Sequence, residues 1–197
     1  MAAVGQAGTE EAMHNQGMPA EKALEKLKEG NQAYLNASSN PGDISSDIRK
    51  KTCDEGQFPY AIVITCSDSR VIPESIFSAG IGEIFTIRVA GNVMDNHQLG
   101  SVDYAAGHLG SKLVMVLGHT HCGAVGAALT SEPTGYIKTI TDEIRRAAGD
   151  EKDETKACRL NVERSVKIIK ESLQLASDVL VCGAVYHIDS GKVEFLD

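Results

Sequence analysis

The sequence has no excess of positive charge and no long hydrophobic run. It carries 19 Lys and Arg against 27 Asp and Glu, a formal net charge of −8, which argues against nucleic acid or an anionic membrane surface as a partner. The longest apolar run, residues 179–186, is far shorter than the roughly 20 residues that cross a bilayer. The 197 residues are enough for one domain with a sizeable core.

The first residues also lack the basic region and apolar core of a secretory signal, so we expect a cytoplasmic, reducing location. The five cysteines are an odd number and show no disulfide framework. Reduced thiols and metal ligation are therefore the better interpretation. Cys53, Cys158 and Cys182 lie alone in polar or strand contexts, and we interpret them as structural.

The order of apolar runs predicts an α/β fold with a mostly parallel central sheet, flanking helices and an N-terminal helical arm. Continuous runs at residues 61–64 and 113–117 are typical of parallel strands that are buried on both faces. We expect residues 36–50 to be a polar connection. We expect residues 1–18 to be a flexible segment and residues 19–197 to be a single domain.

Two of these expected strands end in residues that bind metal ions. The run 61–64 leads to Cys66, and the run 113–117 leads to His119 and Cys122. The carboxyl ends of neighbouring parallel strands meet at one edge of a sheet, where α/β proteins bind ligands. Two thiolates and one imidazole suit zinc, and three protein ligands leave the fourth position that catalytic sites keep for water. The alternative is that all three are ordinary core residues.

Asp68 and Arg70 follow Cys66 at alternate positions. An Asp so close to a zinc thiolate either becomes the fourth ligand and closes the site, or is held away from the metal. A guanidinium can hold a carboxylate through two parallel hydrogen bonds, and Arg70 is placed to do so. Asp68 could then orient zinc-bound hydroxide. A solvated surface pair is the alternative.

Residues 66–70 (CSDSR) and 118–123 (GHTHCG) together resemble the two signatures of the β-class carbonic anhydrases, and residues 21–31 resemble the family's first helix. The resemblance implies a single zinc domain with one Zn²⁺ per subunit. It implies reversible hydration of carbon dioxide to bicarbonate and a proton by attack of zinc-bound hydroxide. The implied zinc ligands are Cys66, His119 and Cys122, and the implied catalytic dyad is Asp68 and Arg70.

The resemblance also implies a substrate pocket. Gln57 matches the family's substrate-binding glutamine, and Phe85, Ala90 and Tyr104 match positions of a small apolar pocket. In the family this pocket is shared across a dimer interface, so a homodimer or homotetramer is implied. His121, next to Cys122, is a candidate proton relay.

The chain also departs from the family pattern. It has no tryptophan, and Val63 stands where a regulated subgroup has one, so that subgroup's bicarbonate inhibition is not expected. Val89 replaces a common asparagine. Two alternatives stay open at this point. One is a carbonyl sulfide or carbon disulfide hydrolase on the same scaffold. The other is a non-enzymatic zinc or thiol switch with Asp68 as fourth ligand.

Overall fold

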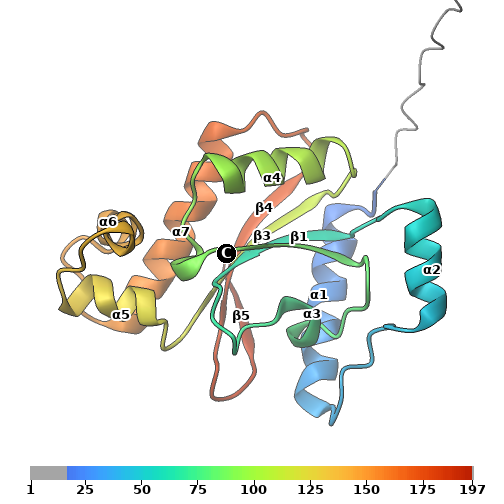
Figure 1. Ribbon diagram of the computed structural model, residues 1–197, viewed down its shortest axis with the longest axis horizontal. Coiled ribbons are helices and arrows are strands. Elements are labelled where there is room, and N and C mark those ends of the chain that lie inside the picture. Colours follow the sequence, from blue (N-terminus) through green and yellow to red (C-terminus); the bar gives the residue numbers. More distant parts are fainter. Residues whose placement is uncertain (1–16, 197) are drawn as a thin grey trace, which may run out of the picture.

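A computed structural model describes residues 17–196, and its centre is a five-stranded sheet (Figure 1). The strand order is β2-β1-β3-β4-β5. The first four strands pair in parallel, and the last pairs antiparallel with β4. The predicted α/β class is therefore confirmed. The strands are β1 (Ala61–Thr65), β2 (Ile84–Arg88), β3 (Leu113–His119), β4 (Leu180–Tyr186) and β5 (Val193–Leu196).

Within residues 17–196, seven helices and one short 3-10 turn connect and cover the strands. The predicted flexible segment, residues 1–18, lies outside the described residues except at its last two positions. The helices are α1 (Ala20–Asn36), α2 (Ser46–Glu55), α3 (Pro73–Ile76), α4 (Asn96–Gly107), α5 (Gly123–Thr130), α6 (Tyr136–Ala148) and α7 (Glu154–Ser172), and the turn is η1 (Ala90–Asn92).

Helix α2 contradicts the prediction of a polar connection over residues 36–50. The Ser45 side chain accepts a hydrogen bond from the backbone N–H of Ile48, at 3.3 Å, and so caps the helix. None of the ten residues of α2, all of which the structure describes, is buried. A helix without a buried stripe leaves no apolar period in the sequence, which is why the prediction was wrong.

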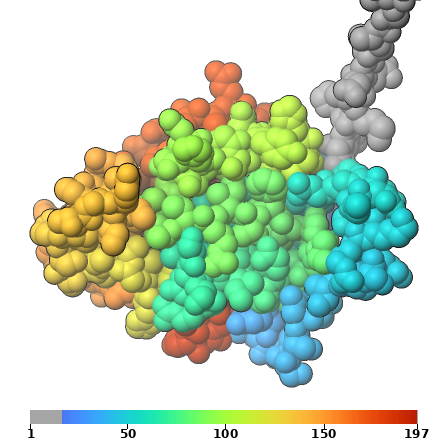
Figure 2. Space-filling view, in the orientation of Figure 1, coloured from blue at the N-terminus to red at the C-terminus, as the bar shows by residue number. Residues whose placement is uncertain are grey.

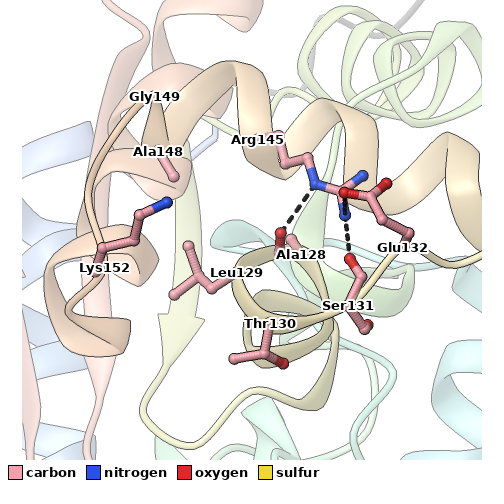
Figure 3. A pocket seen from close by; sticks show the side chains of 9 residues that line it. All are labelled: Ala128, Leu129, Thr130, Ser131, Glu132, Arg145, Ala148, Gly149 and Lys152. Carbon is pink, nitrogen blue, oxygen red and sulfur yellow. Dashed lines mark hydrogen bonds and ion pairs between the residues drawn. The ribbon is translucent and has the colours of Figure 1, made fainter.

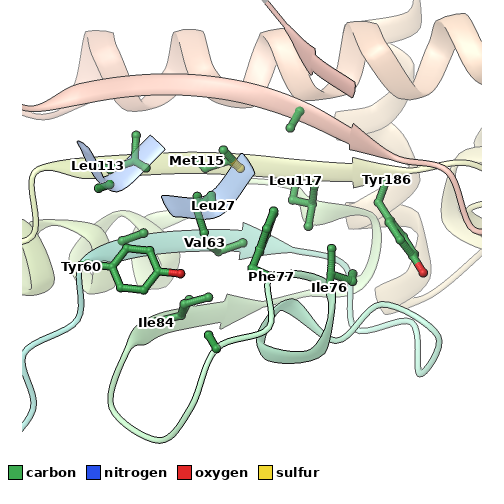
Figure 4. Packing of buried hydrophobic residues seen from close by; sticks show 14 of the residues in the cluster. Leu27, Tyr60, Val63, Ile76, Phe77, Ile84, Leu113, Met115, Leu117 and Tyr186 are labelled. Carbon is green, nitrogen blue, oxygen red and sulfur yellow. The ribbon is translucent and has the colours of Figure 1, made fainter. Parts of the chain in front are cut away.

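The two faces of the sheet have separate cores. Ala61 and Val63 belong to the cluster beneath α1 and α3, where Leu27 and Phe77 pack on the sheet (Figure 4). Ile62 and Ile64 point to the opposite face, beneath α4 and α7. Successive residues of a strand alternate between faces, so burial on both sides explains the unbroken apolar run of β1.

The chain changes direction between β1 and β3, which are neighbours in the sheet. From β1 it passes through α3 to β2 at one edge, and it returns through α4 on the opposite face to β3. Such a reversal between adjacent parallel strands opens a crevice at their carboxyl ends. Thr65 is paired with Leu117, so the residues that follow both strands emerge side by side.

Helices α5 and α6 lie beyond this edge of the sheet. Coloured yellow to orange, they project at the left of the space-filling view (Figure 2). They join Val93, which follows η1, and the start of α7 in a third apolar cluster, which contains Cys66, Cys122 and Ile144. The carboxyl ends of β1 and β3 are therefore covered by packed helices.

Candidate metal centre and active site

The structure brings Cys66, His119 and Cys122 together at the crevice. The metal-binding atoms of the three residues all lie within 4.8 Å of one another. Cys66 directly follows β1, His119 ends β3, and Cys122 is the N-cap of α5. Their exposed fractions are 5%, 0% and 2%. Three soft ligands in a closely packed, dry setting have the composition of a zinc site with three protein ligands.

The His119 ring has a defined tautomer. Its Nδ1 lies 2.9 Å from the carbonyl oxygen of Thr120, and a carbonyl only accepts, so Nδ1 carries the hydrogen. Nε2 is then the bare nitrogen, and it is buried with no hydrogen-bond partner within residues 17–196. A metal-binding imidazole has this arrangement, with its second nitrogen donating to a carbonyl. The residues present therefore fit a zinc ion.

Cys66 has the character of a thiolate. The neighbouring Cys122 thiol lowers the pKa of the Cys66 thiol. The backbone N–H of Gly91, 3.2 Å from Cys66 Sγ, acts in the same direction. The neighbouring Cys66 sulfur and burial raise the pKa of the Cys122 thiol, and the backbone N–H groups of Val125 and Ala124, in the first turn of α5, act in the opposite direction.

Arg70 holds the carboxylate of Asp68 through two parallel hydrogen bonds. Nε donates to Oδ1 at 2.9 Å and Nη2 donates to Oδ2 at 2.7 Å. These bonds hold the pKa of Asp68 well below its usual range. Nη2 of Arg70 also donates to the carbonyl oxygen of His121 at 3.0 Å. Both oxygens of Asp68 are thus engaged by Arg70, and Asp68 is outside the group of three residues that could hold a metal ion.

Arg88 contributes to the site, although the sequence did not single it out. At the end of β2, its Nε donates to the carbonyl oxygen of Cys66 at 3.1 Å, and its Nη2 donates to that of Asp68 at 2.7 Å. Arg88 is paired with Thr65 across the sheet. Arg88 therefore fixes the backbone that carries Cys66 and the carboxylate of Asp68. The one feature of the sequence that could have indicated this role is the position of Arg88 at the end of the strand beside β1.

Three of the predicted substrate-pocket residues, Gln57, Phe85 and Tyr104, lie apart from Cys66, His119 and Cys122. Gln57 is exposed and precedes β1, whereas Cys66 follows the same strand. The Phe85 and Tyr104 rings are 6.2 Å apart, and Phe85 is paired with Ile62, near the start of β1. Within one chain the structure does not bring these three side chains to Cys66. Ala90 differs, because it begins η1, whose Gly91 contacts Cys66.

His121 and Cys158 lie near Cys66, His119 and Cys122 but are not part of that group. His121 is exposed, with a backbone φ of 55°, and its carbonyl accepts the bond from Arg70. Cys158, predicted to be a lone structural thiol, is buried, and its Sγ donates to the carbonyl oxygen of His119 at 3.1 Å. Cys158 thus supports the backbone of a predicted ligand from α7.

A polar cavity of about 440 Å³ lies at the carboxyl ends of α5 and α6 (Figure 3). Nε of Arg145 donates to the carbonyl oxygen of Ala128 at 2.9 Å, and the guanidinium also contacts the Ser131 carbonyl and the Glu132 carboxylate. These bonds satisfy carbonyls at the end of α5. The residues that line this cavity include none of the predicted site residues.

Comparison with known proteins identifies the family. A family model described as carbonic anhydrase matches residues 61–193. The carbonic anhydrase of Mycolicibacterium smegmatis is 34% identical over 190 residues, which cover 87% of this chain and 91% of that protein. Carbonic anhydrase 2 of Mycobacterium tuberculosis is 33% identical, covering 89% and 92%. The chain belongs to the β class of carbonic anhydrases, the enzymes that hydrate carbon dioxide.

Solved structures agree with this. The β-carbonic anhydrase CafA of Aspergillus fumigatus is similar with a TM-score of 0.70 and 27% identity, covering 90% of each chain. A tetrameric β-carbonic anhydrase of Sordaria macrospora has a TM-score of 0.66 and 25% identity, covering 89% of this chain and 94% of that one. These comparisons give no support to the alternative of a carbonyl sulfide or carbon disulfide hydrolase. No helix within residues 17–196 is long and apolar enough to span a bilayer.

Proposed function

We propose that this chain hydrates carbon dioxide reversibly to bicarbonate and a proton with one zinc ion per subunit, held by Cys66, His119 and Cys122. One observation carries the proposal. Nε2 of His119 is buried and without a hydrogen-bond partner among the described residues, and it belongs to a residue packed against two thiols. Leaving a buried nitrogen unpaired is costly, and a metal ion would remove that cost.

Zinc bound at this position would supply a hydroxide nucleophile near neutral pH by lowering the pKa of water. Two thiolates would balance the charge of the ion, so we expect a weaker Lewis acid than a site of three imidazoles provides. The chain's own groups must therefore orient the reactants well.

Asp68 is the proposed orienting group. Arg70 keeps its carboxylate ionised and fixed, so it can accept a hydrogen bond from the hydrogen of the nucleophile. The lone pair of the nucleophile would then point toward carbon dioxide. Arg88 supports this geometry because it holds the backbone carbonyl of Asp68 itself.

The substrate pocket is proposed to include a second copy of the chain. Gln57, Phe85, Ala90 and Tyr104 are its proposed residues, and the Gln57 amide would donate to the oxygen that gains negative charge. Residues 58–65 separate Gln57 from Cys66, and the five of them that form β1 span about 16 Å. A homodimer or homotetramer would let the Gln57 of one copy reach the metal site of another. The tetrameric relative of Sordaria macrospora supports such an assembly.

The proposed setting is the cytoplasm. All five cysteines, each within the described residues, are free thiols, and reducing compartments keep thiols in that form. With a net charge of −8, neither nucleic acid nor a membrane surface is proposed as a partner.

Metal analysis combined with stopped-flow hydration assays tests the zinc site. We expect one zinc per chain, and we expect Cys122→Ser to lose both zinc and activity. Cys53→Ser is the matched control, because Cys53 is exposed on α2 and its loss should change neither. Metal-free protein that still hydrates carbon dioxide would refute the proposal. Protein that holds zinc but is inactive at every pH would favour the non-enzymatic switch.

Subunit complementation tests the shared pocket. Gln57→Ala and Cys66→Ala are each expected to be nearly inactive as pure assemblies. In a dimer that combines one chain of each, one site carries both defects and the other carries neither. Random reassociation of equal amounts should then restore about a quarter of the parent activity. Mass spectrometry would show whether mixed dimers have formed. If they have formed and no hydration activity is recovered, Gln57 and Cys66 of the same chain belong to one site.

A further inference from the structure

The sulfur of Cys66 accepts a hydrogen bond from the backbone N–H of Gly91 at 3.2 Å. Gly91 lies in η1 with a φ of 69°, a left-handed conformation that favours glycine. A Cβ added there would lie 2.8 Å from Cδ1 of Ile144 and 3.1 Å from Cβ of Ala124. The turn is therefore closely packed against α5 and α6, and its N–H is aimed at the sulfur.

Helix α7 holds this turn from the other side. The amide Nδ2 of Asn161 donates to the carbonyl oxygen of Gly91 at 2.7 Å, and Oγ of Ser165 donates to that of Asn92 at 3.1 Å. Asn161 and Ser165 are each 2% exposed. A buried polar side chain is costly unless it is hydrogen-bonded, and here both side chains on α7 are used to secure one short turn.

We propose that Asn161 is a positioning residue for the metal centre, acting through the Gly91 N–H on the sulfur of Cys66. The inference rests on the proposed zinc site. A hydrogen bond to a metal-bound thiolate withdraws electron density from sulfur, and partners of this kind tune the metal's properties. Two thiolates donate strongly, so a fixed N–H on one of them preserves Lewis acidity. Asn161 lies on α7, far along the chain from the ligands.

The hydrogen bond can be tested directly in the parent protein. In protein loaded with ¹¹³Cd in place of zinc, the amide proton of Gly91 should show scalar coupling to the metal through the N–H···S contact. The amide of Asn92 is the internal control, because its N–H donates to the carbonyl of Val89 at 3.0 Å. Absence of coupling at Gly91 in fully loaded protein would overturn the proposal, whether or not any variant folds.

The role of Asn161 is tested in the cobalt-substituted protein. Asn161→Ala should shift the sulfur-to-cobalt charge-transfer band to longer wavelength, because a thiolate with a weaker hydrogen bond is easier to oxidise. Ser165→Ala is the matched comparison, since it removes a similar buried bond to the carbonyl of Asn92 instead of that of Gly91, and it should shift the band much less. An unchanged band in Asn161→Ala, or an equal shift in both variants, would overturn the proposal. Failure of the parent to bind cobalt or cadmium would instead refute the zinc site itself.

Discussion

Asn31 on α1 is expected to be important for stability because it joins three parts of the fold. Its Nδ2 donates to the carbonyl oxygens of Gly191 at 3.0 Å and Ile76 at 3.3 Å, and its Oδ1 accepts from the N–H of Val193 at 3.0 Å. Asn31 is 2% exposed. It thereby fastens the β4–β5 hairpin to α1 and α3.

The hairpin in turn holds the residue after the predicted histidine ligand. The N–H of Thr120 donates to the carbonyl of Tyr186 at 3.0 Å, and Oγ1 of Thr120 accepts from the N–H of Ile188 at 3.1 Å. The carbonyl of Thr120 fixes the His119 ring. Loosening of the hairpin should therefore reach the metal site through Thr120.

Replacement of Asn31 by Ala would leave the buried Gly191 carbonyl without its side-chain partner and would remove the bond to Val193. An orphaned buried group costs about 1–3 kcal/mol and an ordinary hydrogen bond contributes about 1 kcal/mol. We therefore expect Asn31→Ala to lower the free energy of unfolding by roughly 2–4 kcal/mol, a large part of the total for a domain of this size.

Urea unfolding of zinc-loaded protein measures this loss, with parent and variants at one protein concentration because association contributes to apparent stability. Asn36→Ala is the control. Asn36 ends the same helix, is exposed, and within residues 17–196 its side chain donates to the carbonyl of Gln32 alone, at 2.8 Å, so its loss should change stability by less than about 0.5 kcal/mol. Equal losses in the two variants would refute the reasoning.

Three further predictions concern the proposed site. Arg70→Lys should lower the hydration rate by about 10- to 100-fold at unchanged zinc content, because one ammonium cannot replace two parallel bonds to Asp68; an unchanged rate would count against the dyad. The lowered pKa of Asp68 means that its pairing stabilises the fold above the ordinary value of 3.8 and is lost as pH falls through the folded-state value. Asp68 thus stays ionised at neutral and alkaline pH, so its titration does not change the rate in that range. We expect the hydration rate to rise there because water bound to the proposed zinc ion would lose its proton. A flat or falling profile would contradict the proposed ligands. Chelation should abolish hydration, expose the thiols of Cys66 and Cys122 to a thiol reagent, and be reversed by zinc; persistent activity without metal would contradict the mechanism.

The strand ends at the proposed metal site could be predicted because each strand and the residues that follow it are contiguous in the sequence. A buried apolar run followed at once by Cys66, or by His119 and Cys122, defines both the strand and the chemistry at its end. The pairing of Asp68 with Arg70 was equally local, and the structure has its two bonds.

Other features depend on contacts between distant segments and left no local pattern. Asn161 donates to a carbonyl 70 positions away, and an isolated Asn on an amphipathic helix does not reveal such a partner. Helix α2 was missed because it has no buried stripe. Gln57 was identified only through its resemblance to a family position, since nothing nearby in this chain indicates a role in binding.

Gln57 precedes β1 and Cys66 follows it, and this separation has a consequence for how activity scales with the amount of protein. If two subunits share each pocket as proposed, an isolated subunit would keep its fold and its zinc but would lack a complete substrate pocket. Turnover per chain would then fall on dilution, following mass action, while the metal content stayed constant. The association equilibrium of the subunits would therefore govern catalysis as directly as the ligands of the metal do.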